Sequence, residues 1–360
     1  MTGRAILTLN AGSSSVKFAV FLAGNPPRHA LQGAIEGIGA QPRFRAGDTQ
    51  EDWSDTEGFH ALTGRLLRWI EANETAGPLV AVGHRIVHGG DDFTAPVPLD
   101  DVVLERLAAL APLAPLHQAH NLEPARMVAR HRPDLPQFGC FDTAFHRTIP
   151  PLHRTLPLPA KLGLRRYGFH GLSYEFIAHR LAELGITRHR VVIAHLGNGA
   201  SACALRDGVS IDTTMGATAL DGMIMGTRSG SVDPGALLYL MTERGFDAEA
   251  LTNQLYDESG LKGVSGLSGD MRELHKSDKA EARLAIALFV LRAAQEIARM
   301  AVSLGGMECL VFTGGIGEND AAIRDAIAER LAGAGMATEI RVIPTDEAAM
   351  IARHVMEQLG

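Results

Sequence analysis

The chain has 360 residues, of which 46% are hydrophobic and 21% are charged. This length and balance predict a folded protein of about two domains and exclude a disordered chain. The net charge of -7 disfavours a nucleic-acid surface, which needs lysine and arginine clustered on one face. No stretch reaches the ~18 apolar residues of a membrane span, and the N-terminus lacks a signal-peptide pattern. We therefore expect a cytoplasmic protein with no membrane or nucleic-acid partner.

Hydrophobic periodicity, taken in chain order, predicts alternating strands and helices. The expected strands are 6–9, 16–21, 79–82, a strand that ends at Asp142, 191–194, 202–205 and 309–312; the expected helices lie around 62–72, 102–110, 279–303 and 321–333. A proline-rich segment, 136–159, is the expected domain junction, because proline blocks both a helix and a central strand. The alternation indicates an α/β protein.

Cysteine and histidine give little reason to expect a structural metal site. Cys140, Cys203 and Cys309 stand in apolar contexts without CxxC spacing, which predicts buried free thiols. His117 and His120 lie three residues apart, but no carboxylate motif accompanies them. The sequence therefore disfavours a zinc site.

One sequence pattern occurs twice. Residues 7–21 (LTLNAGSSSVKFAVF) and 191–205 (VVIAHLGNGASACAL) each have an apolar strand, a polar residue at its end, a glycine two residues later, a small polar turn and a second strand. The polar residues are Asn10 and His195. This repetition predicts a duplicated structural unit.

Three loops that follow apolar strands are rich in small residues: 10–15, 195–201 and 313–319. Such loops let several backbone N–H groups point together at an anion, and phosphate is the usual occupant. An ordinary β-hairpin remains the alternative for the first loop taken alone. None of the three matches a GxxxxGK[ST] or a clean GxGxxG motif, so a nucleotide held by several short loops between two domains fits better.

The motifs NAGSSSVK, GHRIVHGG, APLAPLH, FDTAFH, RRYGFHG, HLGNGAS, MGTRSG, SGLSGDMREL and FTGGIGEN follow one another along the chain. Together they resemble the acetate kinase family of short-chain carboxylate kinases. The resemblance implies two duplicated actin-like (ribonuclease H-like) domains with an active-site cleft between them. It places the carboxylate and phosphoryl side in 1–145 plus 348–360, and nucleotide binding and dimerisation in 146–347.

The same resemblance implies the reaction: ATP- and Mg²⁺-dependent, reversible phosphorylation of acetate to acetyl phosphate in a homodimer, with Mn²⁺ as an alternative metal. Phosphoryl transfer to a carboxylate brings two anions together, and arginine suits their neutralisation because it stays protonated and forks onto oxygen pairs. The implied catalytic residues are Arg85, His117, Asp142, His170 and Arg228.

The resemblance also implies the binding residues. By this resemblance, Asn10 and Glu347 would bind the metal. The residues of the acid pocket would be Arg85, Val87, Leu116, Phe169 and Ala219. The residues that the resemblance implies for binding the nucleotide and its phosphates are Ser13, Ser15, Lys17, His195, Leu196, Gly197, Asn198, Gly199, Asp270, Met271, Arg272, Gly315, Ile316, Gly317 and Asn319. A covalent phosphoenzyme on His170 or Glu347 is chemically conceivable, but direct in-line transfer is favoured, because the arginines and the metal supply charge and positioning.

The chain departs from the family pattern at 215–222, which reads MGATALDG where MGFTPLEG is usual. Ala217 and Ala219 thus replace a phenylalanine and a proline, and the missing wall predicts a wider acid pocket. Room for one methylene is worth ~1–3 kcal/mol of discrimination, so propionate or a slightly larger acid stands beside acetate as a predicted substrate. Ser231 occupies a position where aspartate is common, and the segment between Asn319 and Pro344 is shorter than usual.

A non-catalytic ATP-binding protein of the same fold is the alternative of another class. Such a protein would need the phosphate loops but no carboxylate site. The presence of Arg85, Asp142, His170 and Arg228 together disfavours it.

Overall fold

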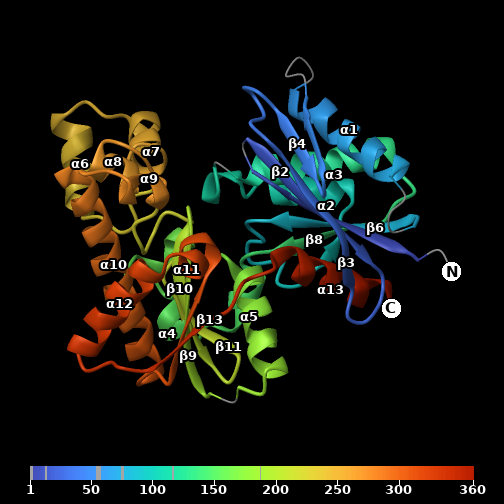
Figure 1. The fold of residues 1–360 in the computed structure, drawn as a ribbon. Coiled ribbons are helices and arrows are strands. Elements are labelled where there is room, and N and C mark those ends of the chain that lie inside the picture. The colour runs from blue at the N-terminus through green and yellow to red at the C-terminus, as the bar shows by residue number, and fades with distance from the viewer. Residues whose placement is uncertain (1–2, 13, 54–57, 74–76, 116, 187) are drawn as a thin grey trace. The chain divides into compact units, whose positions relative to one another are not determined.

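The computed structural model describes residues 3–12, 14–53, 58–73, 77–115, 117–186 and 188–360. The chain divides into two compact units, and Figure 1 shows its helices and strands. Unit 1 comprises Met1–Phe145, Gly171–Phe176 and Asp346–Gly360, and unit 2 comprises His146–His170 and Ile177–Thr345. Ser13 and Leu116, two of the predicted site residues, lie outside the described residues.

Unit 1 is built on a mixed sheet in the order β5-β4-β3-β2-β1-β6-β8-β7. β1 pairs antiparallel with β2 and parallel with β6, and β6 pairs parallel with β8. The carboxyl ends of these three parallel strands therefore meet at one edge of the sheet. The strands are β1 (Ala5–Ala11), β2 (Ser15–Leu22), β3 (Arg28–Glu36), β4 (Arg43–Ala46), β5 (Thr49–Asp52), β6 (Leu79–Ile86), β7 (Val97–Pro98) and β8 (Gln137–Phe141).

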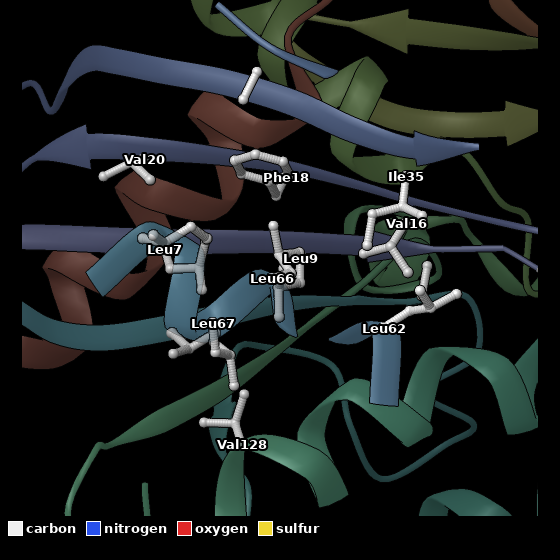
Figure 2. Close-up of a cluster of buried hydrophobic side chains, with 14 of the residues drawn as sticks. Leu7, Leu9, Val16, Phe18, Val20, Ile35, Leu62, Leu66, Leu67 and Val128 are labelled. Atoms are coloured by element: carbon white, nitrogen blue, oxygen red, sulfur yellow. The ribbon is translucent and has the colours of Figure 1, made fainter. Parts of the chain in front are cut away.

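Successive side chains of a strand point to opposite faces of the sheet, and the central strands carry apolar side chains on both faces. Helices therefore cover both faces of this sheet. Leu7 and Leu9 pack with α1 (Gly58–Ala72) and α3 (Gln118–His131), as Figure 2 shows for Leu62, Leu66, Leu67 and Val128. Ile6, on the other face of β1, packs with α13 (Glu347–Leu359). A shorter helix, α2 (Asp101–Ala108), begins at the N-cap Asp100.

Unit 2 repeats the arrangement at the centre of unit 1. Its sheet has the order β11-β10-β9-β12-β13, and β9 pairs antiparallel with β10 but parallel with β12, which pairs parallel with β13. The order and directions match β3-β2-β1-β6-β8, which confirms the predicted duplication and the α/β class. The strands are β9 (Arg190–Leu196), β10 (Ala200–Arg206), β11 (Val209–Thr213), β12 (Cys309–Thr313) and β13 (Glu339–Val342).

The helices of unit 2 include one long helix with a buried face and several shorter helices. α10 (Ala280–Leu304) packs against β9 and β10 and buries Phe289, Ile297 and Met300. The others are α4 (Pro151–Arg154), α5 (Gly171–Glu183, whose first six residues belong to unit 1), α6 (Pro234–Glu243), α7 (Ala248–Tyr256), α8 (Gly260–Ser265), α9 (Met271–His275), α11 (Gly314–Asn319) and α12 (Ala321–Gly333). In the described part of the chain, no helix combines the length and the apolar character needed to cross a membrane.

Candidate active site

Four of the predicted residues meet at the carboxyl edge of the unit 1 sheet. Arg85 forks onto Asp142, with Nε 3.1 Å from Oδ1 and Nη2 2.6 Å from Oδ2. Its Nη1 donates to Asn10 Oδ1 at 3.2 Å, and its Nε lies 3.6 Å from Glu347 Oε2. Asn10 Nδ2 in turn donates to Glu347 Oε2 at 3.3 Å. One guanidinium therefore joins two carboxylates and an amide.

The topology explains this convergence of residues that are far apart in sequence. Asn10, Arg85 and Asp142 lie at or just beyond the carboxyl ends of the parallel strands β1, β6 and β8. Glu347 is the first residue of α13, whose N-cap Asp346 accepts a hydrogen bond from Ala349 N. The partial positive charge of a helix N-terminus favours a carboxylate at that position.

Burial makes this cluster electrostatically strong. The Asp142 side chain is 1% exposed, and those of Arg85 and Glu347 are each 18% exposed. Burial alone would lower the pKa of Arg85, but the charges of Asp142 and Glu347 outweigh it and raise that pKa. Arg85 therefore stays cationic between the two carboxyl groups.

The other predicted residues of unit 1 lie around the same strand ends. Val87 is buried just beyond β6. Lys17 is exposed on β2 directly opposite Asn10, and the Ser15 carbonyl accepts from Gly12 N at 2.8 Å across the turn between β1 and β2. His117 is the half-buried residue that precedes α3.

Asn121 is a residue of this region that the sequence analysis missed. Its Oδ1 accepts from Val87 N at 2.9 Å, and its Nδ2 donates to the carbonyl of Ala11 at 2.5 Å. It therefore joins the segments that follow Arg85 and Asn10. No sequence motif marked it, because the burial of this amide on α3 is visible only in the folded chain.

In unit 2, His170 and Arg228 converge on Gly199. A Cβ atom built on Gly199 would lie 3.1 Å from Arg228 Nη2 and 3.2 Å from His170 Nε2. His170 precedes α5 in a left-handed conformation, with φ at 59°. Its Nδ1 lies 2.8 Å from Ser201 Oγ, and its ring stacks on His195 with centroids 4.4 Å apart. Ser201, which lies in the quoted motif HLGNGAS, was not predicted as a site residue.

Arg228 is bound to the loop that carries the predicted acid-pocket wall. Its Nη1 donates to the carbonyl of Ala219 at 2.8 Å. Ala219 is buried and Ala217 is half-buried. Phe169 is also buried, and its carbonyl lies 3.0 Å from His146 Nε2.

The loops after β9 and β12 adjoin each other, because these strands are parallel neighbours. A Cβ on Gly197 would lie 3.6 Å from Gly315 N. Glu318, which the sequence analysis missed, holds the second loop: its Oε1 accepts from Gly314 N at 2.9 Å and from Thr345 N at 3.1 Å. The remaining predicted residues of the two loops are Leu196, Asn198, Ile316, Gly317 and Asn319, whose Nδ2 donates to the Gly315 carbonyl at 2.9 Å.

The segment 270–272 lies beside the first of these loops. Asp270 caps α9 and pairs with Arg272 at 2.5 Å, and the hydrogen bond from Arg272 lowers the pKa of Asp270. Met271 is buried, whereas the Arg272 side chain is 86% exposed. A Cβ built on Gly226 would meet both Asn198 Oδ1 and the Gly269 carbonyl, so the loops that contain Asn198 and Asp270 flank one glycine.

The cysteines show no sign of a structural metal site in the described part of the chain. Cys140, Cys203 and Cys309 are buried and free, which confirms the prediction. Over the described ranges, no three His, Cys, Asp or Glu side chains are grouped so as to hold a metal ion by themselves.

The structure is similar to crystal structures of two kinases. A propionate kinase from Francisella tularensis subsp. tularensis SCHU S4 has a TM-score of 0.90 at 35% identity, with 98% of each chain covered. The Porphyromonas gingivalis acetate kinase has a TM-score of 0.87 at 32% identity, with 99% of this chain and 100% of that chain covered. The fold is thus that of the acetate and propionate kinases.

The sequence comparisons give the family. The family model described as the Acetokinase family matches residues 5–353. The acetate kinase of Rhodopseudomonas palustris (strain ATCC BAA-98 / CGA009) is 46% identical over 386 residues, which cover 97% of each chain. This chain belongs to the acetokinase family, as its motifs predicted.

Proposed function

We propose that this protein transfers the γ-phosphoryl group of ATP to acetate, reversibly forming acetyl phosphate and ADP. The observation that carries the proposal is the cluster at the carboxyl edge of the unit 1 sheet, in which Arg85 joins Asp142, Asn10 and Glu347. A protein that only binds a nucleotide has no need of this buried cation. We infer that unit 1 carries the carboxylate and phosphoryl side and that unit 2 binds the nucleotide.

The chain's arginines and His170 supply charge and hydrogen bonds for an in-line transfer. Arg85 neutralises the acid and the transferring group, and Arg228, whose Nη1 is held by the Ala219 carbonyl, supplies a second positive charge for the transfer. The 2.8 Å hydrogen bond between Ser201 Oγ and His170 Nδ1 orients the ring, and His170 donates from Nε2 to a phosphoryl oxygen in the proposed transfer. His117 assists at the phosphoryl site. No phosphoenzyme on His170 or Glu347 is required.

The residues of unit 1 fit a hard divalent cation. The Glu347 carboxylate and the Asn10 amide oxygen are the oxygen donors that Mg²⁺ prefers, and Mg²⁺ usually takes only one or two protein carboxylates beside water and substrate phosphates. They would hold Mg²⁺, with Mn²⁺ as the alternative, and Asp142 would act through water. When bound, the metal neutralises phosphate charge. The two carboxyl groups that Arg85 contacts in one small cluster support this assignment.

The nucleotide binds to the loops of unit 2, which supply backbone N–H groups close together. The phosphate side consists of His195, Leu196, Gly197, Asn198 and Gly199, with Ser13, Ser15 and Lys17 contributed by unit 1. The ribose and adenine side consists of Asp270, Met271, Arg272, Gly315, Ile316, Gly317 and Asn319. The contact between the loops at Gly197 and Gly315 supports one continuous binding surface.

Propionate is the second candidate substrate. The alanines at 217 and 219 leave the 215–222 loop without the bulkier residues that are usual in the family, and a structural neighbour is named a propionate kinase. Val87, Leu116 and Phe169 complete the proposed apolar pocket. Propionate kinase activity would leave the reaction and its catalytic residues unchanged.

The function is tested by trapping acyl phosphate as its hydroxamate in the presence of ATP and Mg²⁺, with acids from formate to butyrate. We expect acid-dependent product with acetate or propionate, and none after the metal is removed with EDTA. A maximum at propionate would assign specificity to Ala217 and Ala219. No acyl phosphate with any acid, or ADP release that is independent of the acid, would refute the kinase proposal.

We also propose that the protein is a homodimer formed through unit 2. Every residue of α6 is partly or fully exposed, including Leu238, Tyr239 and Met241, whose relative exposures are 63%, 50% and 43%. Clustered apolar side chains in contact with water mark an interaction surface. A second copy of the chain is the partner that the family membership favours.

A further inference from the structure

Arg166, in the motif RRYGFHG, donates hydrogen bonds to several successive backbone carbonyls. Its Nη1 lies 2.9 Å, 3.1 Å and 2.8 Å from the carbonyl oxygens of Thr213, Thr214 and Met215. The next residue continues the contact, because Tyr167 N donates to the Gly216 carbonyl at 3.0 Å. Four successive carbonyls, from the last residue of β11 onward, are thus held by residues 166 and 167.

The surroundings of Arg166 are those of a structural anchor. Its side chain is 13% exposed, with Nε 3.8 Å from Asp212 Oδ1 and Nη1 3.7 Å from Asp221 Oδ2. Both carboxylates flank the segment that Arg166 binds. A planar guanidinium presents several donors in fixed directions, whereas a lysine presents one compact charge on a flexible stem.

The segment that begins at these carbonyls ends at another set of contacts. After Met215 the chain passes Ala217 and reaches Ala219, whose carbonyl accepts from Arg228 Nη1. Ser231 Oγ donates to Asp221 Oδ1 at 2.6 Å and accepts from Gly222 N at 3.0 Å. The loop 213–222 is therefore held at both ends by contacts that do not involve the side chains of residues 217 and 219.

We propose that Arg166 is a positioning residue for phosphoryl transfer, which fixes the loop 213–222 and thereby the acid-pocket wall at Ala219 and the orientation of Arg228. The inference rests on the proposed function. It also explains why small residues at 217 and 219 would widen the pocket: a loop anchored at both ends keeps its path when side chains between the anchors are lost.

The test is Arg166→Lys, with Arg206→Lys as the matched control. Arg206 lies in the same unit and donates to one backbone carbonyl, that of Leu304, at 3.0 Å. For Arg166→Lys we expect kcat/KM for the acid to fall by about 100-fold, as for other misplaced catalytic groups, and the ratio of propionate to acetate activity to change. KM for ATP should stay within about twofold of the parent value, because the nucleotide loops do not include this segment. Arg206→Lys should leave all these values unchanged.

Two results would overturn the inference. The first is a folded Arg166→Lys whose kinetic constants for the acid equal those of Arg206→Lys. The second is an equal rise in KM for the acid and for ATP, accompanied by a lower Tm. If Arg166→Lys does not fold, Ser231→Ala at the exposed end of the loop is decisive. It should raise KM for the acid without changing KM for ATP, and unchanged acid kinetics would overturn the inference. A parent protein that forms no acyl phosphate with any acid would instead refute the proposed function itself.

Discussion

At Gly199, the addition of one methyl group would test the proposed catalytic roles of His170 and Arg228. A Cβ there would lie 3.1 Å from Arg228 Nη2 and 3.2 Å from His170 Nε2, which is closer than most side-chain contacts. Gly199→Ala should therefore displace both groups by a few tenths of an ångström. We expect kcat to fall by about 10- to 100-fold, because small misplacements of catalytic groups are costly. Steady-state kinetics would measure the loss.

The control for Gly199→Ala is Gly333→Ala at the end of α12, where an added Cβ meets no atom within 4 Å. It should leave kcat unchanged. Thermal unfolding of both variants should match the parent within a few degrees. A fully active Gly199→Ala would contradict the proposed catalytic roles of His170 and Arg228.

At the residue scale, the sequence located the charged groups but not their supports. Arg85 and Asp142 could be chosen because each stands in a distinctive motif beside a strand. Ser201, Glu318 and Asn121 could not, because their roles depend on hydrogen bonds to partners that only the folded chain brings near. The predicted roles of the charged residues stay predictions until variants are measured.

Helix α13 is fixed to unit 1 by a buried histidine. His354 Nε2 lies 3.1 Å from Glu175 Oε1, and the ring lies beside the Cys140 thiol. Burial alone would lower the pKa of His354, but these two neighbours raise it from 6.5 to about 10. The folded state therefore binds one more proton than the unfolded state between these values. The stabilisation is complete below pH 6.5 and is lost as the pH rises to about 10.

We expect the free energy of unfolding to fall between pH 7 and pH 9 by up to about 1.4 kcal/mol per pH unit, measured by urea denaturation. In His354→Gln this decline should be much shallower. His179, which is exposed on α5, gives a control, since His179→Gln should keep the decline of the parent. A decline of the same slope in His354→Gln would show that other groups cause it.

At the element scale, the sequence predicted strands better than short helices. The apolar runs of β1, β2, β9, β10 and β12 lie in fully or largely buried strands, so their pattern was clear. β6 continues to Ile86, four residues past the predicted end at residue 82, and thus includes Arg85. The helices α6 to α9 were not predicted, because helices of five to ten residues offer too few turns for a recognisable period. The longer helices α3, α5 and α13 were also missed; α3 contains Pro124, which argues against a helix when the sequence is taken alone.

The assembly state is a prediction at the scale of the whole molecule. Leu238→Glu would place a charge on the exposed apolar face of α6, where it would be desolvated in an interface but solvated in a monomer. We expect the parent to sediment as a dimer and the variant to shift toward monomer. Val102→Glu is the control, because Val102 is comparably exposed, at 65%, but lies in unit 1. A variant that stays dimeric would exclude α6 from the interface.

The overall architecture was the most predictable property of the molecule. The repeated strand-turn-strand pattern indicated a duplication, and the matching strand orders of the two sheets confirm it. Nothing in the sequence indicated that residues 171–176 belong to unit 1. This affiliation depends on Leu172, which packs with Cys140 and Met350, although the helix α5 continues without a break into unit 2.

The contribution of residues 346–360 to unit 1 has a consequence for synthesis of the protein. These residues follow all of unit 2 in the chain, so they leave the ribosome after it. Until then, one face of the first sheet lacks α13, and Ile6, Ala81 and Cys140 have no cover from Met350, Ile351 and Val355. A nascent chain therefore presents an apolar surface to chaperones and proteases. Glu347 arrives in the same stretch, so the burial of that surface and the completion of the Arg85 cluster occur in one folding event.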